Sequence, residues 1–176
     1  MHLDYHWDAI NGFQNDKSIQ KLLRADYQGI RSLIGKGCIS MDSFIVPAII
    51  KGYVNQVHFY CKQYEEEVGF YQPFLEKYNA AQTDNQNLDF VQNIASQDSI
   101  LFDLDLDLFN RSDMWSEGDL WHVDEIFDLI QKCSVAIKNA LVITIAMSFG
   151  YSGTEQDTVE LVRQIIPRII TIRNNE

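Results

Sequence analysis

The stretch from Ile100 to Phe109 constrains the fold most, because aspartate and apolar residues alternate along it. Period two is the side-chain period of a β-strand, so three carboxylates would lie on one face. A buried carboxylate without a partner costs several kcal/mol, so such groups pair, protonate or bind metal. The stretch from Met1 to Asp8 alternates in the same way. We expect the two acidic runs to meet at the end of one sheet and to bind metal ions.

The remaining chain alternates between strand and helix patterns. Apolar runs of strand length predict strands at residues 1–5, 57–61, 100–108 and 141–146, the last of them buried. Helical spacing predicts helices at 18–34, 44–49 (capped by Asp42-Ser43), 120–140 and 155–170, the last kinked or divided at Pro167. We interpret residues 62–87 as a surface excursion with some helix.

Strands separated by helices indicate one α/β domain over residues 1–176, with a parallel sheet and helices on both faces. Ligands of such sheets bind beyond the carboxyl ends of the strands. The segments after Asp8 and Asp107 and the loop at 148–154 fall on that edge. A parallel sheet normally needs strands beside its metal-bearing strand, and this chain opens inside such a strand, so we expect either a missing segment upstream of Met1 or a start that has been lost.

Composition excludes some classes of function. The 176 residues include 25 acidic and 14 basic side chains, for a net charge of −11. This charge disfavours nucleic acid and suits a cationic substrate. Cys38, Cys61 and Cys133 form no CxxC pair, so neither a disulfide framework nor a zinc knuckle is indicated. No apolar run is long enough for a membrane helix, and no signal peptide is visible, so we expect a cytoplasmic protein.

Asp4, His6 and Asp8 combine hard oxygen ligands with one imidazole, a set that suits Mn²⁺, Fe²⁺ or Zn²⁺ better than Ca²⁺. In a straight strand Asp4 and Asp8 would be about 13 Å apart, so sharing a site requires a bend near His6. Two metal ions would relax this demand. The alternative is that these residues form the polar face of an exposed edge strand.

The same geometry limits the second run. At most two of its three aspartates can reach one cluster. Asp105 and Asp107, nearest the carboxyl end, are the better candidates for ligands. Asp103 would then lie deeper and support a ligand rather than bind metal.

At these residues the chain resembles the ureohydrolase superfamily of arginase and agmatinase, whose members carry a DxHxD motif and a later DxD motif. Here the motifs are Asp4-Tyr5-His6-Trp7-Asp8 and Asp105-Leu106-Asp107. The chain is more similar to a divergent branch, the peptide arginases and their uncharacterised relatives. The matching segments, in the same order as in that branch, are His2 to Asp8, Ser43 to Ala48, Asp103 to Phe109 and Thr144 to Tyr151.

The resemblance implies a three-layer α/β/α sandwich, without the strand or strands that precede DxHxD in the superfamily. It implies two Mn²⁺ ions, with Fe²⁺ or Zn²⁺ as alternatives, and a hydroxide that attacks a guanidinium carbon. The implied metal ligands are Asp4, His6, Asp8, Asp105 and Asp107. The implied reaction converts peptidyl arginine, or another guanidino compound, into peptidyl ornithine and urea. A homo-oligomer is compatible with the resemblance.

Two points stay open. The superfamily takes a further histidine ligand from an upstream strand, and His2 has the right parity but lies one step too far back. No catalytic side chain is identified. Glu155 could meet the guanidinium, or it could favour the amino end of the last helix. The alternatives are a non-catalytic arginase-fold remnant or partner subunit, and a metal-dependent amide deacetylase.

Overall fold

The computed structural model describes residues 1–63, 69–85, 88, 91, 99–112, 114 and 116–174. The chain divides into two compact units. The first comprises Met1–His6, Phe59–Tyr64 and Asn85–Glu176, and the second comprises Trp7–His58 and Glu65–Asp84.

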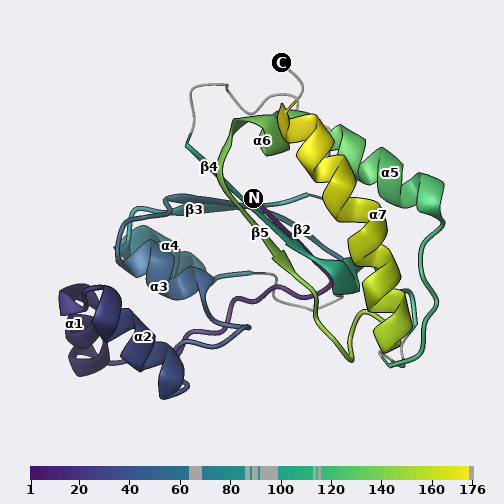
Figure 1. The fold of residues 1–176 in the computed structure, drawn as a ribbon. Coiled ribbons are helices and arrows are strands. Elements are labelled where there is room, and N and C mark those ends of the chain that lie inside the picture. Colours follow the sequence, from purple (N-terminus) through teal and green to yellow (C-terminus); the bar gives the residue numbers. More distant parts are fainter. Residues whose placement is uncertain are drawn as a thin grey trace. The chain divides into compact units, whose positions relative to one another are not determined.

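The fold is α/β with a five-stranded parallel sheet in the order β3-β2-β1-β4-β5 (Figure 1). Its strands are β1 (His2–Asp4), β2 (Gln56–Cys61), β3 (Ala81–Asp84), β4 (Ile100–Asp105) and β5 (Ala140–Ala146). Strand β1 pairs with β2 on one side and with β4 on the other, so the first acidic run lies between two strands.

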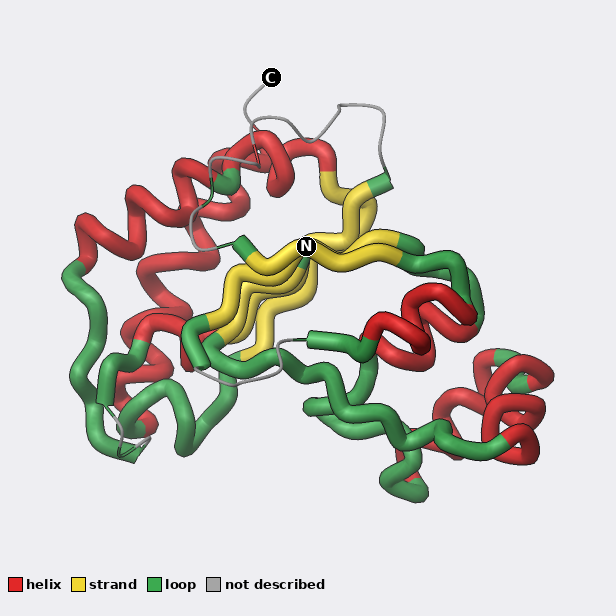
Figure 2. The backbone as a smooth tube through the Cα atoms, turned by 180° about the vertical axis from the view of Figure 1, so that it is seen from behind, coloured by secondary structure: helices red, strands yellow, loops and turns green. Residues whose placement is uncertain are grey.

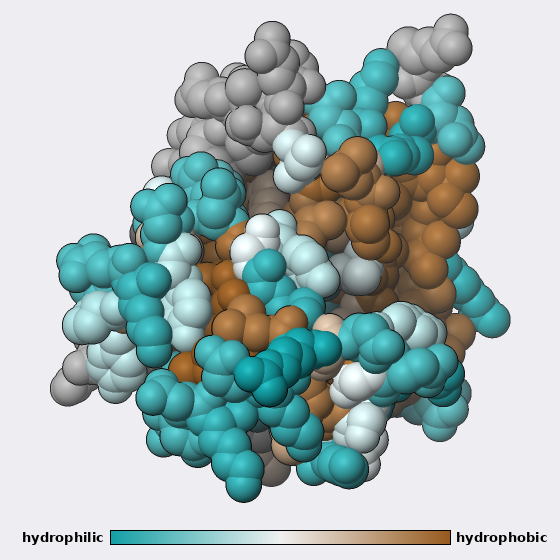
Figure 3. Space-filling view, turned by 90° about the vertical axis from the view of Figure 1, so that its left-hand side faces the viewer, coloured by the Kyte–Doolittle hydropathy of each residue, from teal (hydrophilic) through white to brown (hydrophobic). Residues whose placement is uncertain are grey.

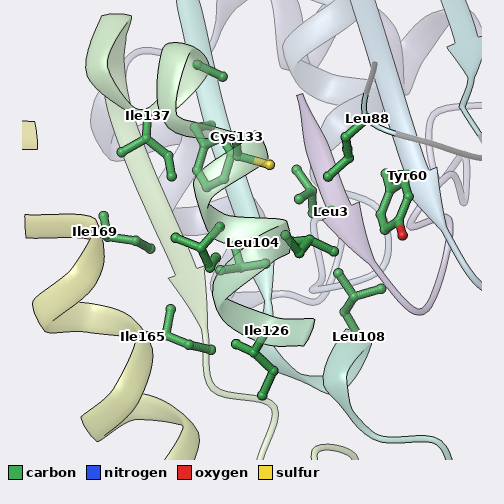
Figure 4. Packing of buried hydrophobic residues seen from close by; sticks show 14 of the residues in the cluster. Leu3, Tyr60, Leu88, Leu104, Leu108, Ile126, Cys133, Ile137, Ile165 and Ile169 are labelled. Atoms are coloured by element: carbon green, nitrogen blue, oxygen red, sulfur yellow. The ribbon is translucent and has the colours of Figure 1, made fainter. Parts of the chain in front are cut away.

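Helices of the first unit pack on one face of its strands. These are α5 (Val123–Lys132), α6 (Ser134–Asn139) and α7 (Glu155–Asn174), which lie side by side in Figures 1 and 2. Figure 4 shows the core between them, where Leu104 of β4 lies among Cys133, Ile137 and Ile165. The apolar residues of each alternating run point toward these helices, and the aspartates lie on the other face of the strands.

The second unit is mainly helical. Its helices are α1 (Asp16–Arg24), α2 (Tyr27–Gly35), α3 (Ile45–Ile50) and α4 (Gln72–Lys77), and β3 follows α4. Gly52 follows the C-cap residue of α3 and has a φ of 71°, a left-handed conformation that glycine adopts without strain and that ends the helix.

Two predicted helices are each divided in two. The helix expected at 18–34 breaks at Ala25, and the carboxylate of Asp26 starts α2 by accepting a hydrogen bond from Gly29 N at 2.9 Å. The helix expected at 120–140 starts only at Val123 and breaks at Cys133. Apolar spacing continues through both breaks, so periodicity alone does not reveal them.

Three further boundaries differ from the prediction. Helix α3 has Phe44 as its N-cap, because the Ser43 hydroxyl accepts a hydrogen bond from Ser40 N at 3.0 Å instead of capping the helix. Residues 62–87 include a strand, β3, besides the expected helix; residues 64–68, 86 and 87 lie outside the described part. Pro167 does not divide α7, which runs through it.

The prediction of a buried strand at 141–146 is wrong about burial. Strand β5 is at the edge of the sheet, and Leu141 and Val142 are 67% and 51% exposed. An unbroken β-branched run indicates a strand but does not tell whether a neighbour covers it.

Candidate metal centre

Parallel pairing brings the two acidic runs together. His2 and Leu3 of β1 lie in register with Asp103 and Leu104 of β4, so the carboxyl ends of both strands meet at one edge. The predicted strand at 100–108 ends at Asp105. Leu106–Phe109 then form a short 3-10 helix, η2, which carries Asp107. The expected meeting of the two runs is confirmed, but Asp107 comes from a helical turn rather than from the strand.

Three side chains converge at this edge. His6 Nδ1 lies 2.8 Å from Asp107 Oδ2 and 3.6 Å from Asp4 Oδ1. One donor atom of each of the three residues lies within 4.8 Å of the other two. We call these residues, Asp4, His6 and Asp107, the acidic cluster. The two carboxylates are almost completely buried, whereas the imidazole is partly exposed.

Backbone amides hold the carboxylates of the cluster in place. His6 N donates to Asp4 Oδ1 at 2.7 Å, and Tyr5 N donates to Asp107 Oδ1 at 3.1 Å. The second bond joins the segment after β1 to η2. Because main-chain groups make these contacts, the carboxylates are oriented before any ligand arrives.

Asp105 lies beside the cluster and is held from two sides. Its Oδ1 accepts a hydrogen bond from Asp107 N at 3.0 Å, and its Oδ2 accepts one from the Ser148 hydroxyl at 2.5 Å. Ser148 lies two residues after the end of β5 and has a φ of 42°, in the left-handed region. The loop at 148–154 therefore reaches the site edge, as the sequence predicts.

His2 and Asp103 form a second layer beneath the cluster. His2 Nδ1 lies 2.7 Å from Asp103 Oδ2, and His2 Nε2 lies 3.3 Å from Asp4 Oδ2. The Thr144 hydroxyl of β5 donates to Asp103 Oδ1. This chain of contacts links three strands and orients Asp4 from behind. Asp103 thus contacts His2 and not the acidic cluster itself.

Burial and mutual repulsion change the protonation of the site. Hydrogen bonds to Asp107 and Asp4 raise the pKa of His6 to about 10. Burial, with the charges of Asp107 and Asp4, raises the pKa of Asp105 to about 8. Burial also raises the pKa of Asp107. Burial by itself would raise the pKa of Asp4, but hydrogen bonding from His6 and the charge of His2 bring this pKa below its usual value. Without metal, protons on His6 and Asp105 therefore offset the carboxylate charge near pH 7.

The donor set of the acidic cluster fits a divalent cation. Two carboxylates and one imidazole are ligands of Mn²⁺, Fe²⁺ and Zn²⁺, and their donor atoms are close enough to share an ion. A cation would displace the proton on His6 Nδ1, since metal ligands must be deprotonated. Asp8, the third residue of the first motif, belongs to the second unit and is not one of the three residues of the acidic cluster.

Two other residues bear on the site. Glu155 lies in the first turn of α7 with an exposed side chain, the position that the helix dipole favours for a carboxylate. The Tyr151 ring packs edge-on against the His6 ring, with centroids 6.1 Å apart. Tyr151 and Ser148 were not predicted as site residues. The position of their loop after a strand was the signal that could have found them.

Comparisons with protein-family models, with curated proteins and with solved structures found no match to this chain. Among the described helices, none is both long enough and apolar enough to cross a membrane.

Proposed function

We propose that this chain is a metal-dependent hydrolase of guanidino groups with an arginase-like three-layer fold. Its reaction would convert peptidyl arginine and water into peptidyl ornithine and urea. The acidic cluster carries the proposal, because it brings both carboxylates and the imidazole of two separate motifs within 4.8 Å of one another. Mn²⁺ is the ion we propose, with two ions as the motif resemblance implies.

Each residue of the site has a separate task. Asp4, His6 and Asp107 would hold the ion, and Asp105 would complete the site from the side of β4. A bound divalent ion supplies Lewis-acid activation of water, which makes hydrolysis feasible near neutral pH. The chain would also favour a cationic guanidinium, since its net charge is −11. Asp103 would hold His2 through a hydrogen bond, and His2 would keep Asp4 oriented through their close contact.

The reaction balances without an oxidant or reductant. Water adds its oxygen to the guanidinium carbon, and the bond from that carbon to the side-chain nitrogen breaks. The carbon leaves as urea, and the nitrogen takes a proton and remains on the peptide as the ornithine amine. An amide deacetylase would use the same type of site but would release a carboxylate instead of urea.

Metal content tests the proposal first. We expect purified protein, loaded with Mn²⁺ and desalted, to retain at least about one ion per chain by elemental analysis, and Asp107→Asn to lose it. Asp128→Asn, which changes an exposed carboxylate of α5, is the matched control and should retain the ion.

Urea release from an arginine-containing peptide should accompany metal binding in the wild-type chain and Asp128→Asn, and be absent in Asp107→Asn. Folded protein that holds no metal above background would contradict the proposal. Bound metal with acetate rather than urea released from a substrate panel would replace it with the deacetylase.

A further inference from the structure

We propose that an extended peptide binds along the open edge of β5 as an added strand, with its arginine side chain reaching Asp105 beside the acidic cluster. This inference rests on the proposed function, because it states how that site would hold its substrate. Its evidence is the exposure of β5, the absence of charge along it, and its position beside the site.

Strand β5 is an edge strand without charge or proline, and its one register shift against β4 lies near its start, at Leu141. In the part of the chain that the structure describes, it pairs with β4 and ends the sheet. Soluble proteins protect such edges with charged residues, proline or bulges that prevent pairing with other chains. Residues 140–153 contain no charged residue and no proline. Among the described residues no strand pairs with the outer edge of β5, so a peptide strand could pair there, the mode known as β-augmentation.

Exposed apolar side chains line the same strand and the loop after it. We call these residues the apolar strip. Their exposed fractions are 67% for Leu141, 51% for Val142, 45% for Met147, 53% for Phe149 and 39% for Tyr151. Figure 3 shows hydrophobic side chains gathered at the surface of the molecule. Single exposed apolar residues are ordinary, but several on one strand and the loop after it suit a binding surface.

The register separates the two faces of β5. Ile143 and Ile145 lie opposite Phe102 and Leu104 and pack on the core. Val142 lies opposite Leu101, which is 40% exposed, and Ala146 lies opposite Asp105. The exposed face of β5 therefore continues directly into the face that carries the site aspartates.

The strip ends at the acidic cluster. Ser148 contacts Asp105 at 2.5 Å, and the Tyr151 ring packs against His6. An added strand would lie about 5 Å from β5 and about 10 Å from β4, so a peptide residue beside the end of β5 would be two strand spacings from Asp105. A long, flexible arginine side chain and the Asp105 carboxylate together can span that separation.

Charge favours the same occupant. A cationic side chain suits a chain of net charge −11, and it would point toward the carboxyl group of Asp105. The uncharged strip would contact the apolar residues of the peptide and leave its arginine to Asp105.

Binding to metal-free protein tests the inference without relying on catalysis. The probe is a fluorescein-labelled eight-residue peptide of alternating valine and threonine with one arginine, followed by anisotropy in EDTA. We expect Val142→Lys to weaken binding at least about tenfold, close to 1.4 kcal/mol. Ile170→Lys is the matched control, because Ile170 is 52% exposed on α7, and it should stay within about twofold.

A second probe tests the backbone pairing itself. The same peptide with alternate amides N-methylated cannot form a strand ladder and should also bind at least about tenfold more weakly. Circular dichroism checks the fold of each variant. Leu141→Lys, at a position that is 67% exposed, serves as the second variant if Val142→Lys does not fold.

The outcomes separate this inference from the proposed function. Equal binding of the methylated peptide, or equal effects of Val142→Lys and Ile170→Lys, would overturn the β5 site even if urea is released. Strand-dependent binding without urea release would support the β5 site and reject the hydrolase. Wild-type dimers that Val142→Lys converts to monomers, with no peptide binding, would overturn the inference in favour of a second copy of the chain.

Discussion

His6 and Asp105 bind protons more tightly in the folded chain than in the unfolded chain. The pKa of His6 is raised from 6.5 to about 10, chiefly by the hydrogen bond to Asp107. The pKa of Asp105 is raised from 3.8 to about 8, chiefly by burial. A raised pKa gives stability that is complete below the unfolded pKa and lost as the pH rises through the folded pKa. The stability that Asp105 contributes is lost between about pH 4 and 8, and the stability that His6 contributes is lost between about pH 6.5 and 10.

We therefore predict that the metal-free chain becomes less stable between pH 6 and pH 9. Both windows overlap this range and have the same sign, so the Tm in EDTA should fall by roughly 5 °C or more. Differential scanning fluorimetry measures it. Asp105→Asn should flatten the dependence in the lower part of the range, whereas Asp128→Asn should leave it unchanged. A Tm that rises with pH would contradict these protonation states.

Added Mn²⁺ should reverse the trend. Metal binding requires His6 to be deprotonated, so the gain in Tm on adding Mn²⁺ should be larger at pH 9 than at pH 6. The difference between the two pH values separates binding at the cluster from a general effect of the salt.

Helix α7 holds the first unit together through one face. Its buried residues include Leu161, Ile165 and Ile169, whereas the neighbouring Ile170 is 52% exposed. We predict that Ile169→Ala lowers the free energy of unfolding by about 2–4 kcal/mol, because it removes buried methyl groups and leaves a cavity. Ile170→Ala should change it by less than about 0.5 kcal/mol. Urea denaturation of the two variants measures both, and equal losses would show that α7 does not pack as described.

Elements of this chain differ in how well local pattern predicts them. The strands at β1, β2 and β4 follow from alternation and apolar runs, whose period is a property of the backbone. The breaks at Ala25 and Cys133 do not, because the apolar face of a helix can continue into the next helix. Strand β3 has the mixed sequence Ala-Gln-Thr-Asp, mostly exposed, and carries no pattern that would indicate a strand.

The net charge of −11 acts on the whole molecule. If an arginine-containing peptide binds at β5, the surrounding negative charge should speed its association, and salt should weaken that attraction. We predict that raising NaCl from about 50 mM to about 300 mM slows association several-fold. Stopped-flow anisotropy measures the rate, with a peptide carrying neutral citrulline in place of arginine as the control. Equal salt dependence of the two peptides would contradict a role for the arginine charge.

Two properties of the site could be predicted without the structure. Alternation places Asp4, Asp103 and Asp105 on the same side of their strands, and parallel topology brings the carboxyl ends of those strands to one edge. Both follow from local periodicity and from the short connections of α/β folds. The other properties of the site depend on burial and on contacts between residues roughly a hundred positions apart in the sequence, which only the structure shows.

Only the folded chain selects which of the candidate ligands meet. Asp107 reaches His6 because the chain leaves β4 and turns into η2, a change of direction that follows from the Asp105 side chain bonding to Asp107 N. His2 supports Asp4 because β4 places Asp103 beside it. The run at 140–146 predicts a strand in any setting, but its exposure depends on whether another strand pairs with it. Local sequence carries the period of a side chain, whereas neighbours in space set its burial, its charge and its partners.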